Sequence, residues 1–239
     1  MKVSVCMATY NGEGFIIRQL ESVLKQLRSD DEVIIVDDCS KDQTVNVIKE
    51  KYESDQRVQL FVNQSNFGVI KSFEKAISLA QGDIIFLCDQ DDIWEDMKVQ
   101  SVLATFESQN PTLVVHDAEV VDGKLEMIHS SWNTYNHNAI DQGLLGNVVK
   151  NAYTGCMMAF KSDIVPSIIP FPKTIEMHDQ WIALVCMIKK KKIIHLNEPL
   201  MKYVRHGGNA TAITKRSVKD QLSGRIRTIT ALASYRNKQ

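Results

Sequence analysis

The chain has 239 residues, of which 44% are apolar and 24% charged, a composition typical of a folded enzyme domain that excludes extended disorder. Its formal net charge of −1 hides an uneven distribution, because the part from Lys189 onward holds 13 Lys or Arg and only two acids, Glu198 and Asp220. Such a basic tail predicts an anionic surface or ligand at that end, or else solvated helix faces.

The cysteines and the apolar runs indicate the compartment. Five cysteines are scattered without CxxC spacing, several of them in apolar runs, which is typical of buried free thiols in a reducing environment. The apolar run Val3 to Ala8 is too short for a signal peptide, and no stretch approaches the ~20 apolar residues that span a bilayer. We therefore expect a cytoplasmic protein, with peripheral contact to the inner face of an anionic membrane as a hypothesis.

The first half of the chain repeats one pattern of apolar strand, polar turn and helix. Strands are predicted at residues 2–8, 32–36, 58–62 and 83–88, and helices at 16–27, 44–52 and 68–80. Continuous apolar strands that alternate with helices indicate a mainly parallel sheet covered on both faces. The expected fold class is therefore α/β, Rossmann-like, with helices flanking the sheet.

The second half is less regular, and its sheet is expected to be mixed. Strands are predicted at residues 113–121, 152–160 and 193–196, a helix at 181–188, a proline-marked loop at 166–172 and a terminal basic amphipathic helix at 217–235. The sequence contains no internal repeat and no low-complexity linker. We expect a single domain over residues 1–212, followed by a basic amphipathic segment over residues 213–239.

Polar residues cluster after three predicted strands, at residues 9–13, 37–42 and 89–92. Ligands of open parallel sheets bind at the carboxyl ends of the strands. The carboxylates of Asp89, Asp91 and Asp92 repel one another unless a cation or several donors compensate. Mg²⁺ and Mn²⁺ favour such oxygen ligands together with substrate phosphates, so we expect Mg²⁺ or Mn²⁺ at Asp89 and Asp91. The alternative is a solvated turn whose acids cap the next helix.

The common glycine-rich phosphate-binding motifs are absent from the sequence. It has no GxGxxG and no GxxxxGK[ST] loop, so NAD binding and P-loop hydrolysis lack their phosphate cradle. A phosphatase with an aspartyl nucleophile is disfavoured, because the DxD lies in mid-chain and continues into Ile93 and Trp94. The pair Asp37 and Asp38 offers a carboxylate to a base or ribose, or else its segment caps the following helix.

Four segments, in this order and spacing, resemble glycosyltransferase family 2. They are VSVCMATYN (3–11), IVDDCSKD (35–42), NFG (66–68) and DQDD (89–92). The resemblance is close over residues 1–110 and weaker to about residue 212. It implies the GT-A fold, transfer with inversion at the anomeric carbon, and a nucleoside-diphosphate sugar donor with uracil or thymine as its base. Residues 1–110 would bind the nucleotide sugar, and residues 111–212 would supply the acceptor site and the catalytic base.

The resemblance also implies roles for individual residues of the first half. Asp91 would hold the metal directly, Asp89 would be shared between metal and ribose, and Asp38 would meet the base. The residues that would contact the nucleotide sugar are Ala8, Thr9, Glu13, Asp38, Asn66, Gly68, Asp89, Gln90 and Asp92.

Two segments of the second half carry the remaining roles. Residues 178–181 (HDQW) look like the family's acidic residue–Asp–x–Trp segment, with histidine in the first position. Asp179 would be the base that takes the acceptor hydroxyl's proton, unless it only caps its helix, and Trp181 would stack on the acceptor sugar. Residues 203–209 (YVRHGGN) resemble the family's His-x-x-Asn. His206 would complete the metal shell or bind the diphosphate, unless it is structural, and Arg205 would pair with phosphate.

The expected activity is metal-dependent, inverting glycosyl transfer to a saccharide or lipid-linked glycan, as in surface polysaccharide synthesis. Two alternatives stay open. A sugar nucleotidyltransferase would carry a Gly-rich basic loop after the first strand, where this chain has NGEG (11–14). A non-catalytic nucleotide-sugar-binding module would tolerate loss of Asp179. No nucleic-acid partner is expected, and no motif specifies the oligomeric state.

Overall fold

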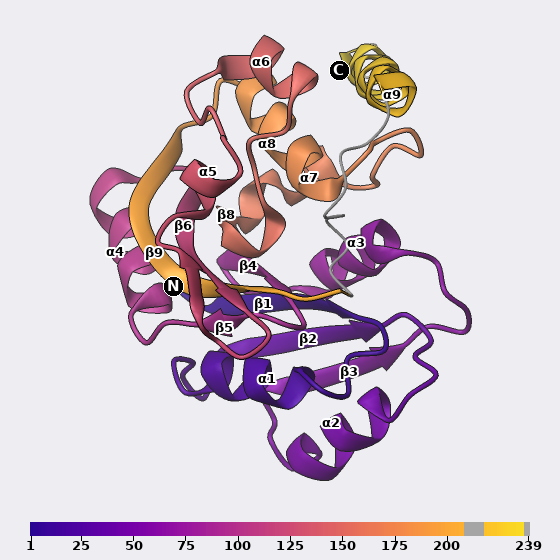
Figure 1. Cartoon of the computed structure of the whole chain (residues 1–239), viewed down its shortest axis with the longest axis vertical. Coiled ribbons are helices and arrows are strands. Elements are labelled where there is room, and N and C mark those ends of the chain that lie inside the picture. Colours follow the sequence, from indigo (N-terminus) through magenta and orange to yellow (C-terminus); the bar gives the residue numbers. More distant parts are fainter. Residues whose placement is uncertain (208–217, 237–239) are drawn as a thin grey trace.

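The computed structural model describes residues 1–207 and 218–236, and within them one mixed sheet runs through the body of the protein (Figure 1). The first half alternates strands and helices, as its repeating pattern predicts. Its elements are β1 (Val3–Thr9), α1 (Ile16–Leu24), β2 (Glu32–Asp37), α2 (Thr44–Tyr52), β3 (Val58–Val62), α3 (Val69–Leu79) and β4 (Ile84–Asp89).

The second half is built from shorter elements. They are β5 (Ile93–Trp94), α4 (Lys98–Gln109), β6 (Leu113–Asp122), β7 (Met127–His129), α5 (Trp132–Tyr135), α6 (Gly143–Val149), β8 (Met158–Lys161), α7 (Val165–Ile168), α8 (His178–Ile188), β9 (Ile193–Arg205) and α9 (Val218–Arg236). Of the predicted terminal segment, residues 213–217 and 237–239 lie outside the described residues.

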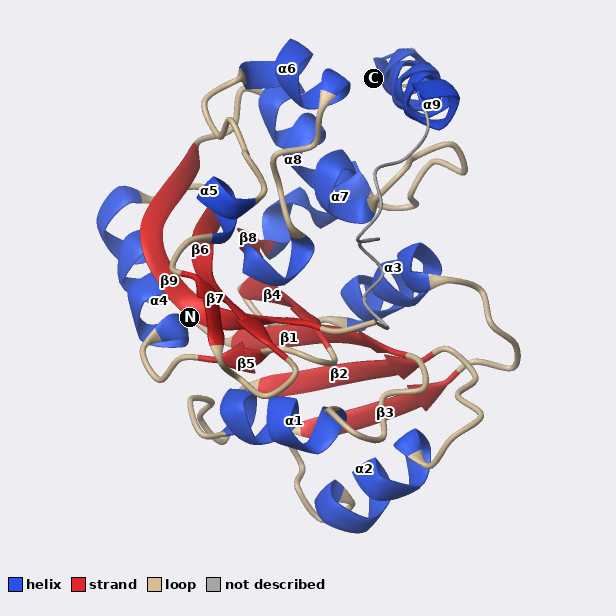
Figure 2. Cartoon of the chain, viewed as in Figure 1, coloured by secondary structure: helices blue, strands red, loops and turns tan. Residues whose placement is uncertain are grey.

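The sheet has the strand order β3-β2-β1-β4-β8-β6-β9-β5, with β7 paired to β6 (Figure 2). Strands β1 to β4 are parallel, and β8 lies antiparallel between β4 and β6. Helices α1 and α2 lie on one face of the parallel part and α3 on the other (Figure 1). The expected fold class, a mixed and mainly parallel α/β sheet flanked by helices, is therefore confirmed.

The apolar pattern explains why the first half folds this way. The residues of β2 are all buried, and those of β1 nearly so, as strands covered on both faces must be. In α1, Ile16, Leu20 and Val23 recur at helical spacing and are fully buried. Burial of such side chains contributes about 1.5–3 kcal/mol each.

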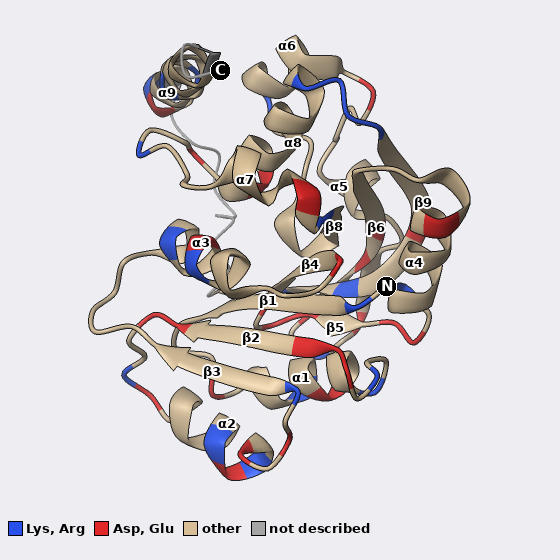
Figure 3. Cartoon of the chain, turned by 180° about the vertical axis from the view of Figure 1, so that it is seen from behind, with Lys and Arg blue, Asp and Glu red and all other residues tan. Residues whose placement is uncertain are grey.

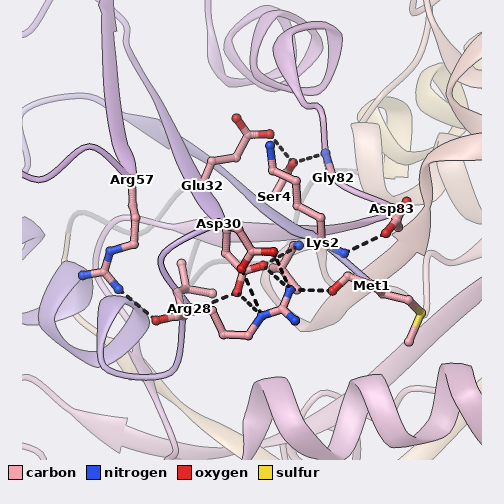
Figure 4. A network of polar contacts seen from close by, with 12 residues as sticks. Met1, Lys2, Ser4, Arg28, Asp30, Glu32, Arg57, Gly82 and Asp83 are labelled. Atoms are coloured by element: carbon pink, nitrogen blue, oxygen red, sulfur yellow. Dashed lines mark hydrogen bonds and ion pairs between the residues drawn. The ribbon is translucent and has the colours of Figure 1, made fainter.

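Polar contacts hold β1 at the end of the strand opposite the polar clusters (Figure 4). The Asp31 carboxylate accepts a hydrogen bond from the Val3 N–H at 2.8 Å. The Ser4 hydroxyl donates to Glu32 at 2.6 Å and accepts from the Gly82 N–H at 2.7 Å. A Cβ at Gly82 would lie 2.6 Å from the Ser4 nitrogen, so only glycine permits this approach. The network ties β1 to the starts of β2 and β4.

Three sequence predictions for the second half are corrected. The predicted strand at 152–160 is a strand only from Met158, because a 3-10 turn occupies Gly155–Met157. The predicted strand at 193–196 continues to Arg205 through register shifts against β6. Pro166 lies in the first turn of α7 rather than in a loop, a position where its missing N–H costs no helix hydrogen bond.

Among the described residues, no helix combines the length and the apolar character that crossing a bilayer requires.

Candidate functional site

The three polar strand ends meet at one cavity of ≈ 330 Å³ at the carboxyl edge of the parallel strands. The second half of the chain closes it through residues before β8 and the start of α8. The predicted residues that line the cavity are Ala8, Thr9, Asp38, Asn66, Gly68, Asp89, Gln90, Asp91 and Asp179. The structure therefore brings together acids that lie ninety positions apart in the sequence.

Gln90 binds the turn that follows β1. Its Oε1 accepts from the Thr9 hydroxyl at 2.5 Å and from the Tyr10 N–H at 2.9 Å, and its Nε2 donates to the Tyr10 carbonyl at 3.1 Å. A Cβ at Gly12 would lie 2.3 Å from Gln90 Oε1, so glycine leaves space for this side chain. The amide therefore fixes the ends of β1 and β4 relative to one another at the cavity wall.

The Asp38 carboxylate organises the loop after β3. Its Oδ1 accepts from Asn63 Nδ2 at 3.0 Å and from the Phe67 N–H at 2.8 Å, and its Oδ2 accepts from the Gly68 N–H at 2.7 Å. Gly68 has a φ of 87°, which favours glycine. Asp38 is buried and lines the cavity; Oδ1 accepts two hydrogen bonds and Oδ2 one, so Oδ2 can accept one more.

Asp91 and His206 contact one another across 115 positions of sequence. His206 Nε2 lies 2.8 Å from Asp91 Oδ2, and the imidazole stacks on Phe15 with ring centroids 4.5 Å apart. Arg18 donates to the Asp91 carbonyl at 3.1 Å. A carboxylate and an imidazole thus converge beside the cavity on a fixed backbone.

Asp89 and Asp92 form a second pair of acids, in which Asp92 is 1% exposed and Asp89 is half-buried. Burial, and secondarily the charge of Asp91, raises the pKa of Asp89 to about 7. The same two causes raise the pKa of Asp92. Asp92 does not line the cavity; its Oδ1 accepts from the Val204 N–H at 3.1 Å and so anchors β9. The ligand atoms of Asp89, Asp92 and Cys156 lie within 4.8 Å of one another.

A buried lysine that sequence reasoning missed lies behind these acids. Lys98 is 1% exposed, donates to the Cys156 carbonyl at 2.8 Å and places its ammonium 4.1 Å from the Trp94 ring centroid. Burial lowers the pKa of Lys98 to about 8. Its charge lowers the pKa of Asp89 and so partly offsets the acids. The Lys98 ammonium and the Arg18 guanidinium thus lie against three acids, two of which, Asp89 and Asp92, have raised pKa values.

Asp179 lies in the first turn of α8 with 6% of its surface exposed. Its Oδ1 accepts from Asn151 Nδ2 at 3.0 Å and from the Gln180 N–H at 2.5 Å, and its Oδ2 accepts from the Gly155 N–H at 3.1 Å. Burial raises the pKa of Asp179 to about 6, against which these hydrogen bonds act. The carboxylate is therefore ionised at neutral pH yet basic enough to accept a proton.

His178 is the neighbour of Asp179 and also lines the cavity. Its ring stacks on Phe73 with centroids 4.1 Å apart, and burial lowers its pKa to about 3, so it is neutral. A Cβ at Gly155 would lie 2.8 Å from His178 Nε2, so glycine makes room for the imidazole. Where the family pattern has an acid, this chain therefore places a neutral ring beside Asp179.

Several expected residues lie away from the cavity. The Glu13 carboxylate accepts from the Gln43 N–H at 2.7 Å and joins the turn after β1 to α2. Trp181 is 2% exposed, and its indole donates to the Ile168 carbonyl at 2.9 Å, so no ring face is open to a sugar. Arg205 pairs with Asp122 in the β6–β9 ladder. Asn209 lies outside the described residues.

Other lining residues were not assigned to the site from the sequence, although Tyr10, His178 and Tyr203 stand in the quoted motifs. Thr154 and Tyr203 are joined through Trp132, whose indole donates to the Thr154 hydroxyl at 2.8 Å and whose ring lies 4.3 Å from that of Tyr203. The lining residues that were not predicted are Tyr10, Val69, Ser72, Thr154, Gly155, Met177, His178 and Tyr203.

The sheet order, the antiparallel β8 and the acid-lined cavity define a glycosyltransferase of the GT-A fold. Residues 4–165 match the family model described as "Glycosyl transferase family 2", and the chain belongs to this family. It is 27% identical over 209 residues to the putative teichuronic acid biosynthesis glycosyltransferase TuaG of Bacillus subtilis, covering 84% of this chain and 78% of TuaG.

Solved structures share the fold. The structure of Staphylococcus aureus TarS residues 1–349 with UDP-GlcNAc superposes with a TM-score of 0.74 at 22% identity, covering 96% of this chain and 66% of that one. The mannosyltransferase PcManGT of Pyrobaculum calidifontis, in complex with GDP-Man and Mn²⁺, gives 0.65 at 20% identity, covering 99% and 63%. The chain thus spans about two thirds of each of these two solved chains, and 37% of the longer solved TarS chain.

Proposed function

We propose that the chain is a metal-dependent, inverting glycosyltransferase. It would move a sugar from a UDP- or dTDP-linked donor to a hydroxyl of a saccharide or lipid-linked glycan in surface polysaccharide synthesis. The observation that carries the proposal is the single cavity that joins the acids after β4 to the buried carboxylate of Asp179. The names of TuaG and TarS, and the UDP-GlcNAc bound to TarS, support the donor class and the process.

The donor would bind along the carboxyl ends of β1, β2 and β4. Asp38, with its loop at Asn66 to Gly68, would face the base, and Ala8 and Thr9 would lie against the nucleoside. Mg²⁺ or Mn²⁺ would be held by Asp91, with Asp89 and His206 as further ligands, and would offset charge on the leaving diphosphate. The Mn²⁺ in the PcManGT complex supports this choice of ion.

Asp179 would act as the base from the opposite side of the sugar. The acceptor oxygen attacks the anomeric carbon, its proton passes to the Asp179 carboxylate, and the bond from carbon to the diphosphate oxygen breaks with its electron pair. A pKa of about 6 leaves this carboxylate unprotonated at neutral pH. Because Trp181 is buried and neither Trp181 nor Arg205 lines the cavity, neither is included as a substrate contact.

The two halves of the chain would have separate roles. Residues 1–110 would bind the nucleotide sugar, and residues 111–212 would supply the base and the acceptor wall, within one domain. A cytoplasmic location at a membrane surface would fit the five cysteines, none of which forms a disulfide.

The test is a thermal-shift screen of UDP-, dTDP- and GDP-sugars, with Mn²⁺ or with EDTA. A uracil or thymine donor with Mn²⁺ should stabilise the chain, by about 2.7 kcal/mol at a hundredfold excess over Kd. Asp91→Asn should abolish the metal-dependent part, and Asp179→Asn should retain it. Stabilisation by no donor, or equal stabilisation in EDTA, would overturn the proposal. Pyrophosphate release from a sugar phosphate and a nucleoside triphosphate would favour a nucleotidyltransferase.

A further inference from the structure

Helix α9 has apolar residues on two opposite faces. Thr228 and Ala231 are buried against the body of the protein. On the other side Leu222, Ile226 and Ile229 recur at i, i+4 and i+7, and each is more than half exposed. A helix that packs on a protein through one face normally carries polar side chains on the other, so this outer apolar stripe requires an explanation.

Helix α6 extends the apolar surface. Leu145 is 81% exposed and Val149 is 55% exposed. The Arg225 guanidinium donates to the Val149 carbonyl at 3.0 Å, so the two helices lie side by side. Both form the same end of the molecule (Figure 1). We call the exposed surface of α6 and α9 the α6/α9 face; its large apolar side chains are Leu145, Val149, Leu222, Ile226 and Ile229.

Cations lie at the same end of the molecule as this face. The run Lys189–Lys192 connects α8 to β9 and passes beside α6, at the same end of the molecule (Figure 3). Lys190 and Lys191 are exposed, whereas the Lys192 ammonium donates to the Gln109 carbonyl at 2.8 Å; α9 adds Lys219 and Arg225. The single acid among the described residues of α9 is Asp220. An apolar patch accompanied by cations is complementary to a surface that is apolar inside and anionic outside.

We propose that the α6/α9 face docks on the surface of an anionic lipid bilayer. Apolar side chains on the exposed side of α9 would enter the boundary between headgroups and acyl chains, while the flanking Lys and Arg remain among the phosphates. Pairing with a second copy fits less well, because a two-fold contact would bring the same cations of both chains together. Docking does not depend on glycosyl transfer.

The position of α9 links this face to the cavity. Arg227 contacts Glu176 at 3.1 Å, and the Thr228 hydroxyl lies 3.4 Å from Gln180 Oε1. Glu176 and Gln180 flank His178 and Asp179, so α9 braces the segment that carries the proposed base. Resting on the proposed function, the inference places the acceptor side of the cavity near the membrane, where a lipid-linked glycan would present its hydroxyl.

Co-sedimentation of the full chain with vesicles tests the docking without donor or metal. Vesicles of phosphatidylcholine alone are compared with vesicles containing phosphatidylglycerol, at low and high salt. We expect binding to the anionic vesicles that weakens with salt. The pair Ile226→Gln and Ile229→Gln should reduce it at least tenfold, and Lys190→Gln with Lys191→Gln about fivefold for each charge.

Matched controls change similar residues elsewhere. Met127→Gln with Ile128→Gln replaces the exposed apolar pair of β7, and Lys49→Gln with Lys124→Gln removes two exposed lysines distant from α9. Both controls should bind as wild type does, and thermal unfolding of every variant verifies folding. Binding that ignores lipid charge and salt, or that the controls weaken equally, would overturn the proposal. The proposal would also be overturned if sedimentation showed a dimer that the double variant Ile226→Gln and Ile229→Gln dissociates, and if the chain did not bind vesicles.

Discussion

Replacing Asp179 with Asn separates the proposed base from the fold that holds it. Burial raises the pKa of Asp179 to about 6 from an ordinary value of 3.8. The ionised carboxylate is thus disfavoured in the native state, by about 3 kcal/mol at 1.36 kcal/mol per pKa unit. Between pH 3.8 and 6 the native chain holds a proton that the unfolded chain has lost, so this residue makes stability fall as pH rises through that window.

The Asp179→Asn variant carries no such charge. The unfolding free energy of the variant minus that of wild type should therefore increase by about 2 to 3 kcal/mol from pH 4 to pH 8. The variant also loses the hydrogen bond from the Gly155 N–H, because an amide nitrogen cannot accept it. This cost is the same at both pH values, so it drops out of the comparison. Urea denaturation in EDTA measures the difference, and initial rates should fall roughly 10²–10⁴-fold while donor-induced thermal stabilisation persists. A stability difference that does not change with pH would refute the raised pKa of the buried Asp179 carboxylate. Transfer by the variant at near the wild-type rate would refute the role of Asp179 as the base.

Three further outcomes are expected. At saturating metal, wild-type transfer should decline as pH falls below about 6, because Asp179 then binds a proton; a rate profile flat down to pH 5 would contradict this. Asp38→Asn should weaken donor binding by about 1–3 kcal/mol in calorimetry, since its amide cannot accept the N–H groups of both Phe67 and Gly68, and unchanged affinity would disprove the loop role. Asp31→Ala should lower the unfolding free energy by about 2–4 kcal/mol in urea and leave donor affinity intact at low temperature, because it strips partners from Val3; a loss under 0.5 kcal/mol would count against the network.

The first half was predictable because its signals are local. Strands β1 to β4 are apolar runs bounded by polar turns, and each lies within one or two residues of its prediction. The rule that ligands bind at carboxyl ends of parallel strands then placed residues 9, 38 and 89–91 at one edge, and they line one cavity. No partner distant in sequence was needed for that step.

Helix α4 was not predicted, although part of its buried stripe was readable in the sequence. Val99, Val102 and Phe106 are buried at helical spacing, but the stripe begins at Lys98, which sequence reasoning assigns to the surface. Lys98 is buried only because the Cys156 carbonyl and the Trp94 ring receive its ammonium. These partners come from other elements and cannot be inferred from the local pattern.

Helix geometry accounts for the placement of Trp181, and the sequence alone could have indicated it. Residues at i and i+2 lie on nearly opposite sides of a helix. Once Asp179 faces the cavity from α8, Trp181 must point into the core, where it meets Ile168 and Tyr235. An aromatic residue suited to sugar stacking would have to lie at i+3 or i+4 from the base, or on another element. Tyr203 lines the cavity from β9, but it is only 5% exposed and its ring lies 4.3 Å from that of Trp132.

The charge of the cluster behind the cavity gives a reason for the metal that motif matching lacks. Asp89 and Asp92 face the buried ammonium of Lys98, and Arg18 donates to the Asp91 carbonyl, so full ionisation of the three acids leaves negative charge in excess of these two cations. Without a divalent cation, burial and mutual repulsion raise the pKa of Asp89 to about 7 and raise that of Asp92, so these acids hold protons instead. A cation that binds here must then displace protons, and its affinity must rise with pH through neutrality. The acids also repel the anionic diphosphate of a donor until the metal is bound. We therefore expect the metal and the nucleotide sugar to bind together.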